Sequence, residues 1–253
     1  MRKEIIRLGD TASTNDFLKT LPTPATDAMT VATAEYQTAG RGQGRNTWES
    51  ERGKNLLFSI LTSPAAVPAA RQFVLSMAGA LALKAALDAR CDGIALKWPN
   101  DIYWHDRKIS GTLIETAVRG KTIARCIYGI GLNVNQREFH SDAPNPVSLL
   151  NITGKETPTD MLLDDILAQF DRYYSLATGG QHDRICREYN DALYRRSETH
   201  SYEDTTTGER FMARITHVDH NGLLHLTDSQ GAERGYTLKQ VRFVIAKKPT
   251  NEQ

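Results

Sequence analysis

The stretch AGRGQGRNTWES, residues 39–50, holds residue types suited to binding an anion. Three glycines and two arginines occupy positions 40–45, and Trp48 follows closely. Glycine lets backbone N–H groups approach an anion, and each guanidinium adds a forked, permanently charged donor. The stretch therefore predicts a phosphate-binding loop, with Trp48 either stacking on a base or packing in the core. A solvated surface loop is the plainer alternative.

A second stretch, KWPNDIYWHDRKISGTLIE at 97–115, adds a carboxylate and an amine. Asp101 follows a proline and an asparagine, which are turn residues, so its carboxylate is expected on a rigid turn. It would suit a magnesium ion or an amine proton there. Taken alone, Asp101 would be a turn former and Lys108 a solvent-facing lysine. Together with the loop arginines and the strand glycine Gly111, however, these two residues indicate a binding site.

Two common nucleotide-binding signatures are not matched. The G-x-G-x-x-G pattern that could start at Gly40 has Arg45 in place of the third glycine. A P-loop ending in the GKT at 120–122 would need a glycine where Glu115 stands. A nucleotide would have to be bound by other means.

The elements that must position these residues form an α+β pattern with a mixed sheet. Apolar spacing predicts a buried-face helix within 68–90 and two further helices from Thr159, the first with Met161 on its apolar side. Short apolar runs predict strands at 29–36, 55–63, 93–99, 107–118 and 122–135.

The residue pattern changes from helical spacing to short alternating runs after about Arg196. Alternating runs at 211–218 and 223–228 meet at Asn221-Gly222, a strong hairpin signal, and short strand-like runs follow. We therefore expect two domains, an α+β domain over 1–196 and a small all-β module of the barrel type over 197–253.

Composition points to an ordinary globular protein of 253 residues, with 40% hydrophobic and 24% charged residues. The net charge of +1 does not indicate binding to nucleic acid or to a membrane. Three separated cysteines make a disulfide framework or zinc site unexpected, and neither a signal peptide nor a membrane-spanning run is recognisable. A cytoplasmic location is expected.

Five short islands of sequence together span most of residues 10 to 150. They are STN at 13–15, QTAGRGQGRNTW at 37–48, KWPND at 97–101, RKISGTLIE at 107–115 and GIGLNVN at 129–135. The same islands occur in this order in biotin protein ligases. The chain resembles that family, whose catalytic domain is class II synthetase-like and whose terminal module is a small SH3-like barrel.

The resemblance implies an activity. Such enzymes use ATP to join the carboxylate of biotin to AMP, expel pyrophosphate, and pass the biotinyl group to a lysine of a biotin carboxyl carrier protein. Mg²⁺ and cations must offset the repulsion between the attacking carboxylate and the α-phosphate. ATP and biotin would be the substrates, with Lys108, Arg41 and Asp101 as catalytic residues.

The resemblance also implies binding roles. Hydroxyl and amide groups suit the neutral ureido ring of biotin, which both donates and accepts hydrogen bonds. Ser13 could instead only cap a helix, Asn133 could be a strand-end turn former, and Asp101 could lie on the metal side or the base side. Biotin contacts are expected from Ser13, Thr14, Asn15, Gln37, Arg41, Gly42, Gln43, Lys108 and Gly111. Adenylate contacts are expected from Arg41, Arg45, Trp48, Lys108 and Asn133, and a metal contact from Asp101.

One position departs from the family pattern. Many family loops read G-R-G-R, and the second arginine helps to hold the reactive adenylate. This chain has Gln43 there, so we expect Arg45 to substitute, because its forked cation could contact the same phosphate. Neutral hydrogen bonding by Gln43 itself is the alternative.

Other functions are compatible with parts of the pattern. Some family members carry an N-terminal DNA-binding domain, but here the first island begins at Ser13, so no repressor function is expected. Lipoate or octanoate transfer and a non-catalytic biotin-binding module are the rivals. Lipoate is apolar at its ring end, so its pocket would not need the polar groups of Ser13, Thr14 and Gln37. Surface or turn roles are expected for His105, His217 and His220, and the sequence leaves open a monomer or a homodimer.

Overall fold

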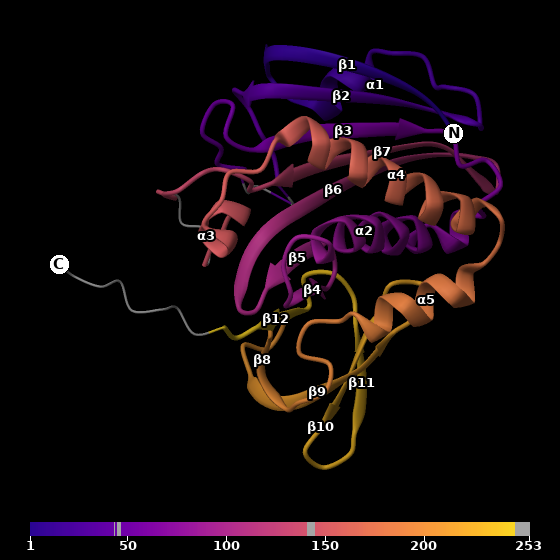
Figure 1. Cartoon of the computed structure of the whole chain (residues 1–253). Coiled ribbons are helices and arrows are strands. Elements are labelled where there is room, and N and C mark those ends of the chain that lie inside the picture. Colours follow the sequence, from indigo (N-terminus) through magenta and orange to yellow (C-terminus); the bar gives the residue numbers. More distant parts are fainter. Residues whose placement is uncertain (43, 45–46, 141–144, 246–253) are drawn as a thin grey trace.

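The computed structural model describes residues 1–42, 44, 47–140 and 145–245. It contains two sheets and one helical layer (Figure 1). No helix in the described ranges is long and apolar enough to cross a membrane.

A seven-stranded mixed sheet forms the larger part of the molecule, in the order β1-β2-β3-β7-β6-β5-β4. Only β1 and β2 run parallel, and every other neighbouring pair is antiparallel. The mixed-sheet α+β prediction is therefore confirmed. The strands are β1 (Arg2–Thr11), β2 (Ala28–Gln37), β3 (Leu56–Thr62), β4 (Ile94–Lys97), β5 (Asp101–Trp104), β6 (Arg107–Arg119) and β7 (Thr122–Leu132).

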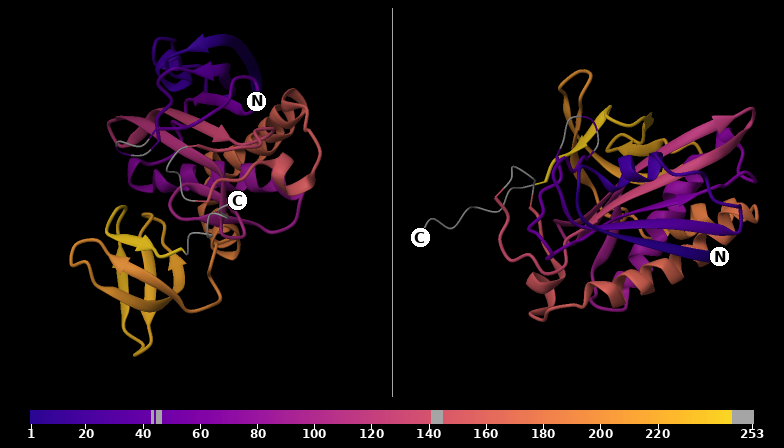
Figure 2. Two further views of the ribbon diagram at one scale, coloured as in Figure 1. Left: turned by 90° about the vertical axis from the view of Figure 1, so that its left-hand side faces the viewer. Right: turned by 90° about the horizontal axis from the view of Figure 1, so that it is seen from above.

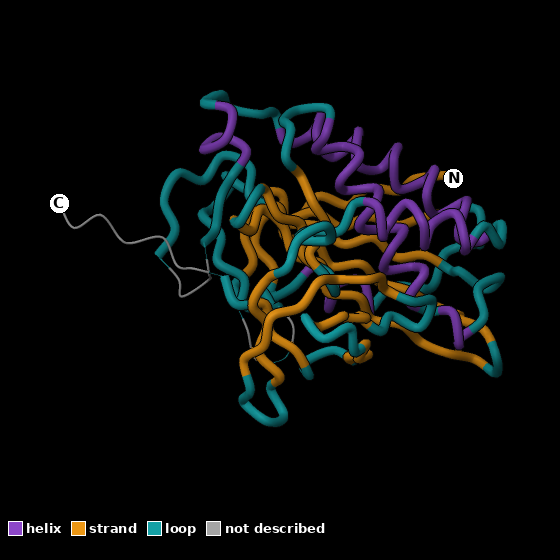
Figure 3. Tube along the Cα trace, turned by 90° about the horizontal axis from the view of Figure 1, so that it is seen from below, coloured by secondary structure: helices purple, strands orange, loops and turns teal. Residues whose placement is uncertain are grey.

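The longest helices cover one face of this sheet (Figure 3). Helix α2 (Phe73–Asp88) is apolar around most of its circumference because it lies between the sheet and two other helices, α4 (Thr159–Thr178) and α5 (His182–Asp191). The expected helices are thus present. Met161 on α4 is 65% exposed, so its expected place on the apolar side is wrong.

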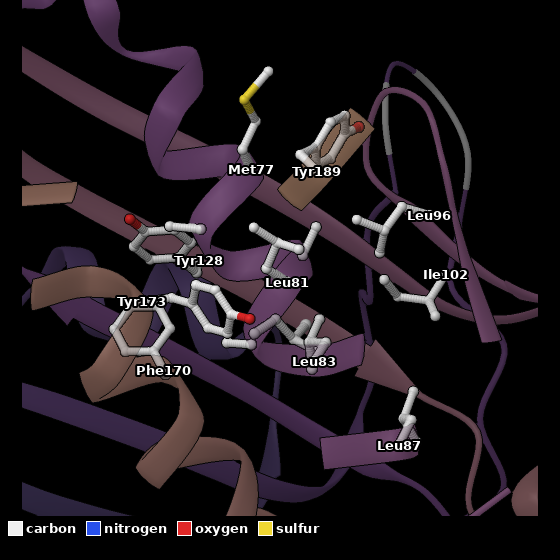
Figure 4. Close-up of a cluster of buried hydrophobic side chains, with 14 of the residues drawn as sticks. Met77, Leu81, Leu83, Leu87, Leu96, Ile102, Tyr128, Phe170, Tyr173 and Tyr189 are labelled. Carbon is white, nitrogen blue, oxygen red and sulfur yellow. The ribbon is translucent and has the colours of Figure 1, made fainter. Parts of the chain in front are cut away.

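The core is built from α2 outward (Figure 4). Met77 and Leu81 of α2 lie in the same buried cluster as Tyr128 of β7 and Tyr189 of α5. The ring of Phe170 meets that of Tyr128 edge-on, with centroids 5.0 Å apart. This packing fixes the sheet from behind and leaves its opposite face for the short helix α1 (Thr14–Lys19), which contacts β2, β3 and β7.

Two short helices complete the larger part. The 3-10 helix η1 (Ala69–Arg71) precedes α2. Helix α3 (Leu149–Thr153) begins with a capping box between Ser148 and Asn151 and ends at Gly154, which adopts φ 72°.

A five-stranded antiparallel sheet follows α5 and projects from one end of the molecule (Figure 2). The predicted all-β structure is present, and Gly222 in the expected hairpin turn has φ 87°. The order β11-β10-β9-β8-β12 is open among the described residues, so the predicted barrel is not confirmed. The strands are β8 (His200–Asp204), β9 (Arg210–Val218), β10 (Leu224–Asp228), β11 (Glu233–Tyr236) and β12 (Val241–Phe243).

Candidate active site

A cavity of about 210 Å³ opens on the α1 face of the seven-stranded sheet. It collects residues from segments far apart in the sequence, namely the turn before α1, the loop after β2, and strands β4 to β7. Ten sequence-predicted residues line it: Ser13, Thr14, Asn15, Gln37, Arg41, Gly42, Trp48, Asp101, Lys108 and Gly111. The sequence predicted no ligand contact for its other lining residues, Thr47, Lys97, Pro99, Asn100, Thr112, Leu113, Gly129, Ile130 and Gly131.

Three predicted site residues stand apart from this group. Gln43 and Arg45 lie outside the described residues. Asn133 is buried just beyond the end of β7 and is not among the lining residues. Its Nδ2 donates to the carbonyl of Val147 at 3.2 Å, while its Oδ1 has no hydrogen-bond partner within the described ranges. Asn133 therefore has a structural role in joining the two segments.

A neutral polar network lines the part of the cavity next to α1. The Thr14 N–H donates to Gln37 Oε1 at 2.8 Å, and the Thr14 hydroxyl lies 2.7 Å from the Ser59 hydroxyl. Ser59 in turn donates to Asn15 Oδ1 at 2.6 Å. These bonds hold the Thr14, Asn15 and Gln37 side chains in one arrangement, with no net charge among them.

Ser13 has the capping role that the sequence also allowed. Its side chain accepts from the Asp16 N–H at 3.4 Å and caps α1. Because Ser13 also lines the cavity, capping and ligand contact are not exclusive.

Two glycines of β7 form the floor. A Cβ on Gly129 would stand less than 3.0 Å from the Asn15 amide, and one on Gly131 less than 3.0 Å from the Trp48 ring. Gly131 pairs with Gly111 of β6, so two adjacent strands lack side chains beneath Trp48. The backbone itself is thus the surface on which Asn15 and Trp48 lie.

A cation and a carboxylate meet at the neighbouring end of the cavity. Lys108 Nζ lies 2.7 Å from Asp101 Oδ1, with side chains only 24% and 15% exposed. Asp101 begins β5 and pairs with Gly111, while a register shift between Ile102 and Tyr103 precedes the pairing of Lys108. The carboxylate and the amine therefore face each other across the glycine floor.

Trp48 lies close to this pair. Lys108 Nζ is 5.7 Å from the Trp48 ring centroid, and the indole Nε1 is buried with no hydrogen-bond partner in the described chain. A buried donor without a partner carries an energetic cost, so it suits a ligand acceptor. The loop returns to the sheet through a hydrogen bond of 3.0 Å from the Trp48 N–H to the Gly40 carbonyl.

Arg41 is paired with an acid that sequence reasoning did not single out. Its Nη2 lies 2.5 Å from Asp16 Oδ1, and both side chains are about half exposed. Lys19 joins Asp16 to Glu115, at 3.0 Å and 2.7 Å. Burial opposes the charge of Asp16, but the hydrogen bonds from Lys19 and Arg41 outweigh it and lower the pKa of Asp16.

Lys97, the first residue of KWPND, is a second cation at the cavity wall. Its Nζ lies 5.2 Å from the ring centroid of Tyr103 and 4.8 Å from that of Phe243 on β12. Burial lowers the pKa of Lys97 below its usual value. This lysine therefore links the cavity to the smaller sheet.

The family model "Biotin/lipoate A/B protein ligase family" matches residues 9–133. The chain is 31% identical over 174 residues to the biotin–[acetyl-CoA-carboxylase] ligase of Paracoccus denitrificans, covering 66% of this chain and 71% of that protein. The chain belongs to the biotin/lipoate A/B protein ligase family.

Longer relatives match over a smaller share. The bifunctional ligase/repressor BirA of Escherichia coli is 33% identical over 112 residues, 44% of this chain and 35% of that protein. BirA of Bacillus subtilis is 30% identical over 152 residues, 57% of this chain and 46% of that protein. The chain thus aligns with about a third to a half of these relatives.

Solved structures share the fold. The Aquifex aeolicus biotin protein ligase in complex with biotin and ATP has a TM-score of 0.79 at 23% identity, covering 95% of this chain and 99% of that one. The Leishmania major enzyme in complex with biotinyl-5-AMP has a TM-score of 0.64 at 24% identity, covering 93% and 99%.

Proposed function

We propose that this protein is a biotin–protein ligase, which forms biotinyl-5'-AMP from biotin and ATP and then biotinylates a lysine of a carrier protein. The observation that carries the proposal is the arrangement within one cavity. A neutral hydrogen-bonding network around Thr14 and Gln37 lies beside the Lys108–Asp101 pair on a shared glycine floor. A ligand with an uncharged polar ring and a carboxylate tail would match both ends.

The neutral end suits a ureido ring. Gln37 Oε1 already accepts from Thr14, so its NH₂ group remains to donate. The Thr14 hydroxyl uses its proton on Gln37 or Ser59 and can therefore only accept from a ligand. The Ser13 hydroxyl accepts from the Asp16 N–H and can still donate. Asn15 is fixed by Ser59 on one side and by Glu115, 2.8 Å from its Nδ2, on the other. Such prearranged groups favour a neutral polar ring over the apolar ring of lipoate.

The charged end suits acyl adenylation. A biotin carboxylate oxygen would attack the α-phosphorus, forming the mixed anhydride while the bond to pyrophosphate breaks. Lys108 and Arg41 would neutralise the negative charge that gathers during this step. In the second step the carrier lysine amine would attack the acyl carbon and AMP would leave.

Asp101 is suited to hold Mg²⁺. Magnesium in nucleotide sites is commonly bound through one or two carboxylates together with substrate phosphates, and Asp101 supplies one at the charged end of the cavity. The ion would offset phosphate charge. Trp48 would lie against the adenine, and a ligand acceptor would satisfy its buried indole N–H. Asn133 is not among the residues that line the cavity, so we assign it no contact with the base.

The smaller sheet and the assembly complete the proposal. We divide the chain into a catalytic domain, 1–196, and an SH3-like module, 197–253, that helps to receive a biotin carboxyl carrier protein. The cytoplasmic location, the lack of nucleic-acid and membrane partners, and a monomeric or homodimeric state remain predictions.

The test is pyrophosphate release from ATP by the purified chain, with biotin compared with lipoate, and then biotin transfer to a carrier domain. Release and transfer with biotin alone are expected. A preference for lipoate would indicate a lipoate ligase, and biotin binding without pyrophosphate release would indicate a non-catalytic binding module.

Asp16→Asn is expected to tighten ATP binding about two- to fivefold. The carboxylate of Asp16 competes with phosphate for Arg41, and a half-exposed ion pair of this kind contributes at most about 1 kcal/mol. Calorimetric titration with ATP would measure the change. Asp160→Asn is the matched control, because Asp160 forms an exposed pair with Arg7 at 3.1 Å. Weaker ATP binding in Asp16→Asn would contradict the competition.

Arg45→Ala is expected to increase escape of biotinyl-adenylate, measured as labelling of bystander lysines without carrier. The expectation rests on the sequence, in which Gln43 replaces the second loop arginine and Arg45 is the nearest remaining cation that could hold the phosphate. Gln43→Arg in the same background should reduce the escape. Unchanged retention in Arg45→Ala would assign the contact to Gln43.

A further inference from the structure

Two histidines of the smaller sheet face each other across neighbouring strands, on the module away from the cavity. His217 of β9 is directly paired with His225 of β10, and their rings are stacked 4.2 Å apart at an angle of 9°. The surface or turn role expected for His217 is therefore incomplete. His225 was not singled out because it lies eight residues away, and only the strand register brings the two together.

The third strand contributes room and a carboxylate. His225 is paired with Gly235 of β11, which has no side chain, so the His225 ring lies over its backbone. Glu233, two residues earlier on the same strand, is on the same face, and its Oε1 lies 3.0 Å from His225 Nδ1. One ligand atom each from His217, His225 and Glu233 lies within 4.8 Å of the others.

A further carboxylate faces the other nitrogen of the same ring. His225 Nε2 is buried and has no hydrogen-bond partner among the described residues, and Asp219 Oδ2 faces it at 3.6 Å. Asp219 is itself fixed, because its Oδ1 accepts the N–H groups of Asn221 and Leu223 at 2.8 and 3.0 Å. A metal-binding histidine typically has such a carboxylate on its second nitrogen, which sets its tautomer and orientation.

From this arrangement we propose that His217, His225 and Glu233 bind a divalent transition-metal ion of the zinc type, with Asp219 as a positioning residue. Two imidazoles and one carboxylate form a donor set that favours zinc over magnesium or calcium. The stacked rings must turn for their lone pairs to converge, because bonds of about 2.0–2.2 Å place tetrahedral ligand atoms roughly 3.4 Å apart. The His225 side chain is 21% exposed and that of Glu233 47%, so this rearrangement needs no opening of the core.

Such a metal ion would tie β9, β10 and β11 together at their exposed face. The site is independent of the proposed ligase activity, because none of its residues lines the cavity near α1.

The test is calorimetric titration of the full chain, freed of metal by a chelator, with Zn²⁺. One equivalent is expected to bind at micromolar or lower concentration, to resist excess Mg²⁺, and to give a four-coordinate visible absorption spectrum with Co²⁺. His217→Ala and His225→Ala should each weaken binding at least a hundredfold. Asp219→Asn should weaken it about 10- to 100-fold while leaving one equivalent.

His140→Ala is the matched control, since His140 also lies near a carboxylate, 3.9 Å from Glu138, but in an exposed position. It should bind Zn²⁺ as the parent does. Thermal unfolding in chelator identifies any variant that fails to fold. Zn²⁺ binding that persists in both histidine variants, for example through the free thiols, would overturn the proposal. An affinity of the parent protein for Zn²⁺ no higher than that of the two histidine variants would overturn it as well.

Discussion

Lys108→Ala is expected to slow biotinyl-adenylate formation about a hundredfold while leaving the fold intact. The amine would contact the attacking carboxylate and the α-phosphate, and losing one charge-assisted contact to developing charge costs on the order of 3 kcal/mol. In the structure Lys108 lies at the cavity, paired with Asp101, and 24% exposed, so its removal leaves no large hole. Single-turnover pyrophosphate release would measure the change.

Lys121→Ala is the control for this variant, because Lys121 is an exposed lysine in the turn between β6 and β7. It should react as the parent does. Asp101→Asn tests the pair from the other side, and its loss of rate should depend on the Mg²⁺ concentration. Near-parental adenylate formation by Lys108→Ala would remove this lysine from the chemistry.

Gly131→Ala and Gly129→Ala are expected to damage different halves of the ligand site. The methyl group on residue 131 would displace Trp48, and the one on residue 129 would displace Asn15. Overpacking of this kind costs about 1–3 kcal/mol, which corresponds to roughly 5- to 150-fold in affinity if the cost falls on ligand binding. We therefore expect Gly131→Ala to weaken ATP binding most and Gly129→Ala to weaken biotin binding most.

Calorimetric titration with each ligand would separate these outcomes. Gly9→Ala is the matched control, because it is also a strand glycine and its Cβ would meet no atom within 4 Å. A general folding defect would lower both affinities in both variants, and that result would contradict the division of the floor.

The sequence predicted the central architecture because its elements carry strong patterns. Helix α2 is apolar almost throughout, and β3 is a fully buried run, so each is recognisable alone. The edge strand β1 escaped prediction because RKEIIRLGDT is mostly exposed and shows no steady alternation. Strand β5 spans only Asp101–Trp104 and directly follows the turn, so Asp101 was expected on the turn and no strand was predicted there.

The candidate site was predictable where a sequence motif contains the chemically active residues. It was not predictable where the tertiary fold or the strand register brings distant residues together. Ten predicted site residues, from four of the quoted islands, line one cavity. The ion pair between Arg41 and Asp16 was not predicted. The two residues are 25 positions apart, and Asp16 resembles an ordinary acidic residue in the first turn of a helix. The floor was missed because only sheet register places Gly111 beside Gly131.

The indole of Trp98 has a consequence for how the protein unfolds. Its Nε1 donates to the Gly222 carbonyl at 3.0 Å, which fastens the hairpin turn of the smaller sheet to the KWPND segment. Buried residues of both sheets, Tyr202 and Phe243 among them, belong to one continuous core. The two parts should therefore melt together in a single cooperative transition, and loosening the smaller sheet should reduce the stability of the turn that carries Asp101.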